Sequence, residues 1–330
     1  MRVVFFGTPE FALPSLQALL QPPSPFEVVG LVCQPDRPQG RGQRVLPPPT
    51  KVLAQAQGIP VWQPVRLRRD AEVLAALAAL AADVFVVVAY GQILPPAVLQ
   101  MPRLGCVNVH ASLLPAYRGA APIQWAIANG ETETGVTTML MDEGLDTGAI
   151  LLQAKLPIGP EQTGLELTSQ LAQLGASLLV ETLLKLEKGE LTPIPQDDSR
   201  ATYAPLLKKQ DFQLDWRRSA QALHNQIRAF SPNCFTGLQG QRIKIVRSAS
   251  PQLHPPPNPL PQGSPGEVVG LAKGEGVYVA TGEGSLLIRR AQLPGRKEQS
   301  AWDLVNGGQL RVGMRFEPLL ETDSSSPQAE

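Results

Sequence analysis

The hydrophobic positions in the first half of the chain follow two patterns. Short, continuously apolar runs favour strands that are covered on both faces, and they lie at residues 2–7, 27–33, 84–89 and 107–110. Stretches with helical composition or periodicity favour helices, and they lie at residues 47–57, 71–82 and 163–188. Strands and helices that alternate in this way predict a doubly wound α/β domain around a parallel sheet.

The turn after the first predicted strand is not a dinucleotide motif. Gly7-Thr8-Pro9 does not continue as the G-x-G-x-x-G pattern. Thr8-Pro9-Glu10 instead combines a capping hydroxyl, a proline and an early acidic residue. These three features predict that a helix starts directly after the first strand.

The second half has a different pattern. Residues 219–230 predict one helix, and short β-like runs separated by glycine-rich turns follow it at 241–247, 266–269, 276–280 and 285–291. Several short strands favour a small β-barrel, whereas the proline-rich stretch 250–265 favours a loop. We therefore predict a first domain at 1–189, a linker at 190–206, a barrel domain at 207–318 and a disordered tail at 319–330.

Composition agrees with two domains, because 330 residues are about twice a common domain length and 43% of them are hydrophobic. No run reaches the ~18 apolar residues of a membrane span, so we expect no membrane partner. The three cysteines are far apart and form no C-x-x-C motif. They predict buried thiols in a reducing cytoplasm, with no zinc or other metal site.

The net charge of zero hides an asymmetry along the chain. Residues 1–199 carry 13 Lys and Arg against 18 Asp and Glu, a net −5, whereas residues 200–317 carry 16 against 8, a net +8. A basic half is what a polyphosphate partner requires; the alternative is a solvated basic surface without a partner. The candidate phosphate contacts lie near the linker and the first barrel strand: Lys208, Lys209, Arg242, Lys244 and Arg247.

Polar side chains concentrate at the end of the fourth predicted strand. Asn108 and His110 are two residues apart, so their side chains point to the same face of that strand. A carboxylate in the later cluster 142–148 would orient the imidazole. An amide donor, a titratable base and an orienting acid suit attack of a neutral amine on a carbonyl. On spacing alone, however, a structural Asn–His pair is the more common explanation.

Two features favour a catalytic role for Asn108 and His110 over a structural one. The chain has only three histidines, and His110 adjoins a loop bounded by glycine and proline. Residues 116–125 also place Arg118 and several small residues just before a helix start. Backbone N–H groups at such a start are free to bind a ligand.

Four segments together resemble the signature of the folate-dependent formyltransferases: Asn108 to His110, Ser112 to Pro115, Arg118 to Gln124, and Asp142 to Gly148. Val3 to Phe11 and Gln34 to Gly42 further resemble the members of that family that act on tRNA. The resemblance covers residues 1–318. It implies a Rossmann-like first domain and an OB-like barrel as the second.

The activity that the resemblance implies is transfer of a formyl group from 10-formyltetrahydrofolate to the methionyl α-amine of initiator tRNA, for translation initiation. It implies Asn108, His110 and Asp146 as catalytic residues. Asn108 would donate its amide N–H to the oxygen on which negative charge develops. A protonated His110 would do the same, whereas a neutral His110 would accept the proton of the amine. Asp146 would hold the ring in place and favour its charged form.

The resemblance also implies where the substrates bind. The residues implied for folate are Ser112, Leu113, Leu114 and Pro115, with Tyr90 and Ile93 in the opposite wall. The residues implied for the tRNA acceptor arm lie in the loop 36–44 and are Arg37, Arg41 and Arg44. The alternatives are an ordinary strand-end turn at 88–93 and a flexible surface loop at 36–44. The family implies a monomer.

Two positions depart from the family pattern. Many relatives have a basic residue where this chain has Ala116, which implies that one phosphate contact is missing. Relatives often have Asn-Pro-Trp-Pro where this chain has Ser231 to Cys234, which affects local packing more than chemistry.

Other functions fit part of the pattern. A formyltetrahydrofolate hydrolase or a sugar-amine formyltransferase would use the same donor, but those relatives are usually fused to further catalytic domains, which we do not expect in 330 residues. A non-catalytic RNA-binding module on the same fold is the third possibility. The presence of Asn108, His110 and Asp146 argues against it.

Overall fold

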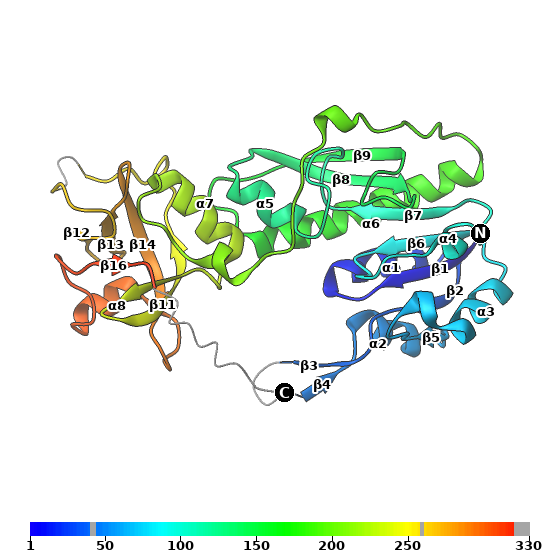
Figure 1. Cartoon of the computed structure of the whole chain (residues 1–330), viewed down its shortest axis with the longest axis horizontal. Helices are drawn as coiled ribbons and strands as arrows, with labels where there is room; N and C mark the ends of the chain where they lie inside the picture. Colours follow the sequence, from blue (N-terminus) through cyan, green and yellow to red (C-terminus); the bar gives the residue numbers. More distant parts are fainter. Residues whose placement is uncertain (40–43, 258–260, 320–330) are drawn as a thin grey trace, which may run out of the picture. The chain divides into compact units, whose positions relative to one another are not determined.

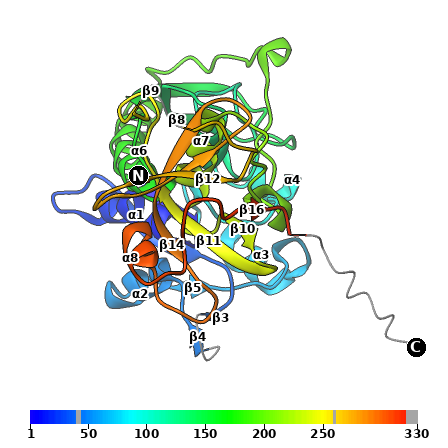
Figure 2. The ribbon, with the colours of Figure 1, turned by 90° about the vertical axis from the view of Figure 1, so that its left-hand side faces the viewer.

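The computed structural model describes residues 1–39, 44–257 and 261–319 (Figures 1 and 2). The described chain forms two compact units. The first contains residues 1–123, 133–157 and 166–206, and the second contains residues 124–132, 158–165 and the chain from 207. Residues 190–206, predicted as a linker, therefore lie in the first unit. Two short pieces of the N-terminal half belong instead to the second unit.

The first unit is built on a mixed sheet with the strand order β5-β2-β1-β6-β7-β8-β9. The strands are β1 (Arg2–Gly7), β2 (Glu27–Val32), β5 (Val61–Trp62), β6 (Val84–Val88), β7 (Cys106–His110), β8 (Glu133–Leu140) and β9 (Ile150–Pro157). Strands from β5 to β7 pair in parallel, whereas β8 and β9 are antiparallel. The α/β class is confirmed, but the sheet is not parallel throughout.

Helices cover both faces of this sheet, as a doubly wound fold requires. They are α1 (Leu13–Leu20), α2 (Pro49–Ala56), α3 (Ala71–Ala79), α4 (Pro96–Leu99) and α6 (Gly164–Glu187), with 3-10 turns η1 (Glu10–Ala12), η2 (Leu67–Arg69) and η3 (Asp198–Arg200). Phe85, Val87 and Cys106 pack in one buried cluster with apolar residues of α3 and α4. A Cβ atom at Gly175 of α6 would lie 2.9 Å from Val109 Cγ1, so α6 lies directly on the opposite face.

Helical structure does follow the first strand, as predicted, but Thr8 does not cap it. The chain first forms η1 and enters α1 only at Leu13, and neither helix has a side-chain cap. The Thr8 hydroxyl instead donates to the Tyr90 carbonyl oxygen at 3.2 Å and accepts from the Gln34 backbone N–H at 3.1 Å. Thr8 thus ties together the loops that follow three neighbouring strands, β1, β2 and β6.

The segment 36–44, for which a flexible surface loop was the alternative to tRNA binding, has paired ends. β3 (Arg37–Gln39) and β4 (Arg44–Leu46) form an antiparallel hairpin. Val45 and Leu46 of this hairpin are exposed. Arg41 lies outside the described residues.

The second unit is an antiparallel β domain with α7 (Ala220–Phe230) packed on it. Its sheet has the order β12-β13-β14-β11-β10-β16, and β15 pairs with β14. Hydrogen bonds between residues 266–268 and 313–316 join the two ends of this order and close the barrel. Its elements are β10 (Phe235–Leu238), β11 (Gln241–Ser248), β12 (Val268–Ala272), β13 (Gly276–Ala280), β14 (Ser285–Gln292), β15 (Gln299–Ser300), β16 (Phe316–Glu317), α8 (Ala301–Asn306) and η4 (Lys209–Phe212).

The remaining helix, α5 (Pro122–Ala128), begins in the first unit and continues into the second. Within the second unit, the Trp125 ring meets the Phe230 ring edge-on with centroids 5.6 Å apart, and Phe212 meets the same ring at 5.7 Å. Residues 158–165 dock on α7 as well. Arg228 donates to the carbonyl oxygens of Gly159 and Gln162 at 3.0 and 3.1 Å.

Candidate active site

The site begins at the C-terminal end of β7. Asn108 and His110 lie on one face of this strand, the face that also carries Cys106, and both are buried, with exposed fractions of 9% and 6%. Val109 lies on the other face, against α6. The predicted placement of the two polar side chains on one face is confirmed. β7 is also the strand at which the sheet changes from parallel to antiparallel pairing, because it pairs in parallel with β6 and antiparallel with β8.

The His110 ring is held by its two nitrogens. Nε2 lies 2.9 Å from the Tyr117 carbonyl oxygen, and Nδ1 lies 3.6 Å from Asp146 Oδ2. A carbonyl oxygen can only accept, so Nε2 carries a proton in this arrangement. Nδ1 is therefore the ring nitrogen at which a proton can be gained or lost, next to a carboxylate.

Asp146 is fixed by its own loop and by a neighbouring one. Its backbone is left-handed, with φ +54°, and its Oδ2 accepts the Gly119 backbone N–H at 2.8 Å. The turn itself is stabilised by a different carboxylate. Asp142 Oδ1 accepts from the Gly144 N–H at 3.0 Å and from the Thr147 hydroxyl at 2.7 Å. Asp142 is thus the turn former, and Asp146 is the carboxylate that faces the imidazole.

The Asn108 carboxamide forms no hydrogen bond with any described residue of the protein. Its polar atoms are not among the fully buried unpartnered atoms of the described residues, so solvent or a ligand can reach them. An unpartnered amide beside a histidine–carboxylate pair is therefore suited to bind a ligand oxygen or to donate to a developing oxyanion.

The Ser112–Pro115 loop is shaped by protein contacts. The Ser112 hydroxyl donates to the Ala116 carbonyl oxygen at 2.6 Å, and the Leu114 N–H donates to Thr137 Oγ1 at 3.1 Å. Gln153 Nε2 donates to the Leu114 carbonyl oxygen at 2.9 Å. Ser112 and Leu114 are buried, so Leu113 and Pro115, which are partly exposed, are the residues of this loop that a flat ligand can reach.

The two residues predicted for the opposite wall lie in different environments. Tyr90 is buried, and its ring meets Phe6 edge-on at 5.4 Å. Its hydroxyl has no partner among the described residues, and burial raises the pKa of that hydroxyl. The Tyr90 side chain therefore belongs to the core, and what it presents to the loop is its backbone. Ile93 is 85% exposed and available for apolar contact.

The predicted tRNA-binding residues that the structure describes are divided between the two units. In the first unit, Arg37 donates to Gln34 Oε1 at 3.1 Å, and Arg44 is exposed on β4. In the second unit, Arg242 and Lys244 alternate with the buried Ile243 and so share the outer face of β11. The Arg242 guanidinium lies 3.8 Å from the centroid of the Phe235 ring. Arg247 follows a register shift in β11, and Lys208 and Lys209 are exposed where η4 begins.

Some of the site was not apparent in the sequence. Thr137 and Gln153, which hold the Ser112–Pro115 loop, come from β8 and β9, neither of which was predicted. The expectation that the N–H groups before α5 are free to bind a ligand is wrong for two of them. The Gly119 N–H donates to Asp146, and the Ala121 N–H donates to the Ala204 carbonyl oxygen. Arg118 is 2% exposed and bonded to Gln196 and Asp198.

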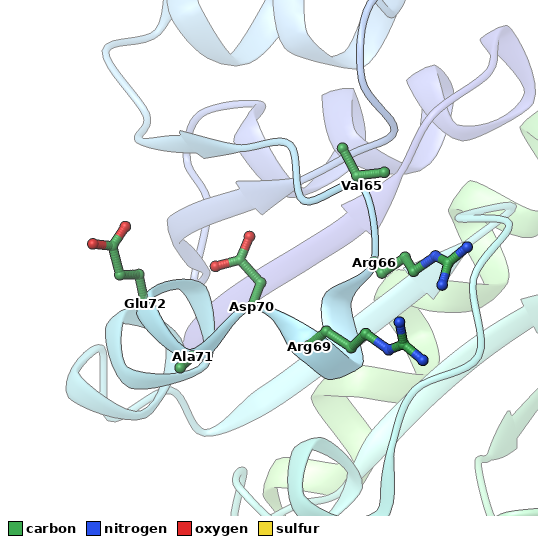
Figure 3. A pocket seen from close by; sticks show the side chains of 6 residues that line it. All are labelled: Val65, Arg66, Arg69, Asp70, Ala71 and Glu72. Carbon is green, nitrogen blue, oxygen red and sulfur yellow. The ribbon is translucent and has the colours of Figure 1, made fainter.

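A separate open depression of about 450 Å³ lies around η2 and the start of α3. Its lining includes Arg66, Arg69 and the exposed Val65, and Figure 3 shows both guanidinium groups on the same side. None of the predicted site residues lines it. The end of β7 is the stronger candidate for the chemistry, because the unpartnered amide and the histidine–carboxylate pair lie together there.

No helix among residues 1–39, 44–257 and 261–319 is long and apolar enough to cross a membrane. The same residues contain no cluster of three His, Cys, Asp or Glu arranged to hold a metal ion. The three cysteines are free thiols and buried, as predicted, and burial raises the pKa of Cys33 and of Cys106 to about 12.

Comparison with known proteins defines the class. The family model described as formyl transferase matches residues 1–183, and the model of the formyl transferase C-terminal domain matches residues 206–309. The chain therefore belongs to the formyl transferase family, and the family predicted from its motifs is confirmed.

Relatives within the family are close. The chain is 92% identical over 319 residues to methionyl-tRNA formyltransferase of Synechococcus sp. (strain JA-3-3Ab), covering 97% of this chain and 99% of the relative. It is 54% identical to methionyl-tRNA formyltransferase of Trichormus variabilis (strain ATCC 29413 / PCC 7937), covering 95% of this chain and 98% of the relative.

Solved structures share the fold at low sequence identity. A sugar 3N-formyl transferase crystallised with dTDP and 5-N-formyl-THF superimposes with a TM-score of 0.62 at 20% identity, covering 90% of this chain and 99% of that one. HypX from Aquifex aeolicus in complex with tetrahydrofolic acid superimposes with a TM-score of 0.60 at 16% identity, covering 96% of this chain and 50% of the other.

Proposed function

We propose that this protein transfers the formyl group of 10-formyltetrahydrofolate to the α-amino group of methionyl initiator tRNA, giving N-formylmethionyl-tRNA for translation initiation. The observation that carries this proposal is the arrangement of Asn108, His110 and Asp146 at the end of β7, in a chain 92% identical to a methionyl-tRNA formyltransferase. The folate donor supplies the formyl group, and we propose no metal ion as a cofactor.

The chemistry follows from the two polar residues of β7. The neutral amine attacks the formyl carbon, which gives a tetrahedral centre with negative charge on oxygen. The unpartnered Asn108 amide donates to that oxygen, and such a donor contributes ~2.7–4 kcal/mol to lowering a barrier. As the N–C bond forms, the amine nitrogen must lose a proton.

His110 is the base in this proposal, and the structure favours Nδ1 as the atom that accepts the proton. Because Nε2 donates to the Tyr117 carbonyl oxygen, the neutral ring has its lone pair at Nδ1. The imidazolium formed by proton transfer then lies beside the Asp146 carboxylate, which stabilises its charge. The proton is finally delivered to the folate nitrogen as its bond to the formyl carbon breaks, so atoms and charges balance.

We propose that the folate donor rests against Leu113 and Pro115, with Ile93 in the opposite wall and Tyr90 contributing its backbone. Ser112 and Leu114 serve by shaping the loop. The hydrogen bonds of Leu114 with Thr137 and Gln153 hold this loop in place, and a loop ordered in advance loses less entropy on binding.

We propose that tRNA contacts both units. The β3–β4 hairpin would offer Arg37 and Arg44, with Arg41 between them in sequence, and β11 would offer Arg242 and Lys244, with Arg247, Lys208 and Lys209 nearby in the chain. Neutralisation of backbone phosphates by these groups would supply most of the affinity. We further propose that the enzyme is cytoplasmic and monomeric. Its catalytic domain would be residues 1–189, and its tRNA-binding barrel would be residues 207–318.

The acceptor distinguishes this proposal from the other activities of the family. Purified protein is incubated with 10-formyltetrahydrofolate and one of three acceptors: methionyl initiator tRNA, an amino sugar nucleotide, or water alone. We expect rapid formylation of the tRNA only. Formylation of the sugar amine, or folate hydrolysis equally fast without any acceptor, would assign the protein to another activity.

A further inference from the structure

The segment 190–206, predicted as a linker, is bonded to the loops of the active site. Gln196 uses every hydrogen-bonding capacity of its carboxamide there. Its Nε2 donates to the carbonyl oxygens of Asp146 and Gly148 at 2.8 and 2.7 Å. Its Oε1 accepts from Arg118 Nε at 3.1 Å and Nη2 at 2.8 Å. One side chain therefore joins the Asp146 loop to the loop before α5.

The same segment also pairs with the backbone around Arg118. The Arg118 N–H donates to the Thr202 carbonyl oxygen at 2.8 Å, and the Ala204 N–H donates to the Arg118 carbonyl oxygen at 2.7 Å. Gly119 lies so close to this segment that a Cβ atom there would be 2.7 Å from the Ala204 oxygen. The Gly119 N–H can then reach Asp146 Oδ2 at 2.8 Å.

Both partners of the His110 ring depend on these contacts. Asp146 has its carbonyl bonded by Gln196 and its carboxylate bonded by Gly119. Tyr117, whose carbonyl oxygen faces His110 Nε2, has its own N–H bonded to Thr202 Oγ1 at 2.8 Å. The segment thus fixes the two groups that determine where the imidazole proton lies.

We propose that Gln196, together with Arg118, is a positioning residue for formyl transfer: it sets the Asp146 carboxylate and the Tyr117 carbonyl around His110. This inference rests on the proposed function for its effect on rate, but its effect on the His110 ring is independent of that function. Asp198, which also accepts from Arg118 but is 82% exposed, contributes little because solvent screens it.

The test replaces Gln196 with glutamate. Gln196→Glu keeps the size of the side chain and its acceptor toward Arg118 but removes both donors to the carbonyl oxygens of Asp146 and Gly148. Misplacement of about 1 Å costs up to ~10²-fold in rate, so we expect kcat for tRNA formylation to fall by ~10-fold to ~100-fold. We expect KM for folate and for tRNA to change by less than about twofold, because the variant leaves the Ser112–Pro115 loop and the basic residues in place.

A spectroscopic readout separates positioning from general structural support. The ¹⁵N chemical shifts of the His110 ring nitrogens report which nitrogen carries the proton, and they should change in Gln196→Glu. Gln173→Glu is the matched control, since it places the same charge on the exposed side of α6 in the same unit. It should match the wild type in ring shifts, kcat and thermal unfolding.

The outcomes distinguish the two proposals. Unchanged ring shifts and unchanged kcat in Gln196→Glu would overturn the positioning role. If the ring shifts change in Gln196→Glu but the wild type does not formylate tRNA, the positioning role stands and the proposed function is rejected. If Gln196→Glu does not fold, Thr202→Val tests the other end of the same contact, because it removes only the hydroxyl that bonds Tyr117. A wild-type kcat and wild-type ring shifts in that variant would reject the inference.

Discussion

Replacing Asp146 by asparagine removes one charge from the site while changing little else. Asparagine keeps the shape of the side chain and an oxygen that can accept the Gly119 N–H. It also tolerates the left-handed backbone at this position, where φ is +54°. What is lost is a carboxylate 3.6 Å from His110 Nδ1.

The magnitude follows from that distance. Two unit charges about 4 Å apart attract by about 4 kcal/mol at an effective dielectric constant of about 20. This sets an upper limit of about 10³-fold on the rate that the charge supplies. The Asp146 side chain is 13% exposed, so solvent screens part of the attraction, and we expect Asp146→Asn to lower kcat by ~10²-fold.

The assay is single-turnover formyl transfer with tRNA and folate both saturating, so that neither binding step limits the rate. Folate affinity should stay within about twofold of wild type, because the charge is not in the proposed folate wall. Asp142→Asn is the control in the same loop, since Asp142 holds the turn and does not face His110. A rate for Asp146→Asn within threefold of that of Asp142→Asn would refute the role of the Asp146 charge.

Three further predictions test other parts of the account. The three cysteine thiols should resist alkylation at pH 8 in the folded protein and react after unfolding. Burial raises their pKa values, to about 12 for Cys33 and Cys106, and so keeps them protonated. Rapid labelling of the native protein would contradict the burial of these thiols. Arg242→Gln and Lys244→Gln should each lower the slope of log tRNA affinity against log salt by about one or less. The control is Lys273→Gln, at an exposed position between β12 and β13, and effects no larger than in that control would show that β11 does not contact phosphate. Phe230→Ala should lower the free energy of unfolding of the second unit by ~3–5 kcal/mol in denaturant unfolding, since it removes a buried ring that packs on two other rings. A decrease below about 1 kcal/mol would contradict this packing.

Elements with strong periodicity could be predicted from the sequence. The apolar run at 84–89 became β6, and the long amphipathic stretch became α6, because burial on both faces and a helical stripe leave clear patterns. β8 and β9 were missed. β9 alternates partly buried and exposed residues over Ile150–Pro157, and its threonine-rich partner β8 reads as polar although it is almost wholly buried.

The residues of the candidate site also divide into those that the sequence could predict and those that it could not. Asn108 and His110 could be placed together because they lie two residues apart on one strand. Asp146 was implied only by the family resemblance, and the structure distinguishes it from the turn-forming Asp142. Gln196 could not be predicted at all. It lies 50 residues from Asp146 in a stretch whose composition reads as a loop, and only the folded chain brings the two together.

The most direct test of the account is single-turnover formylation of methionyl initiator tRNA by the wild type, Asn108→Ala and His110→Ala. Loss of one oxyanion donor costs ~10²–10³-fold in rate, and loss of a general base costs ~10²–10⁴-fold. We predict that both variants fold, bind folate and tRNA as the wild type does, and lose formyl transfer by these factors. Transfer by either variant at close to the wild-type rate would contradict the assignment of the chemistry to the end of β7.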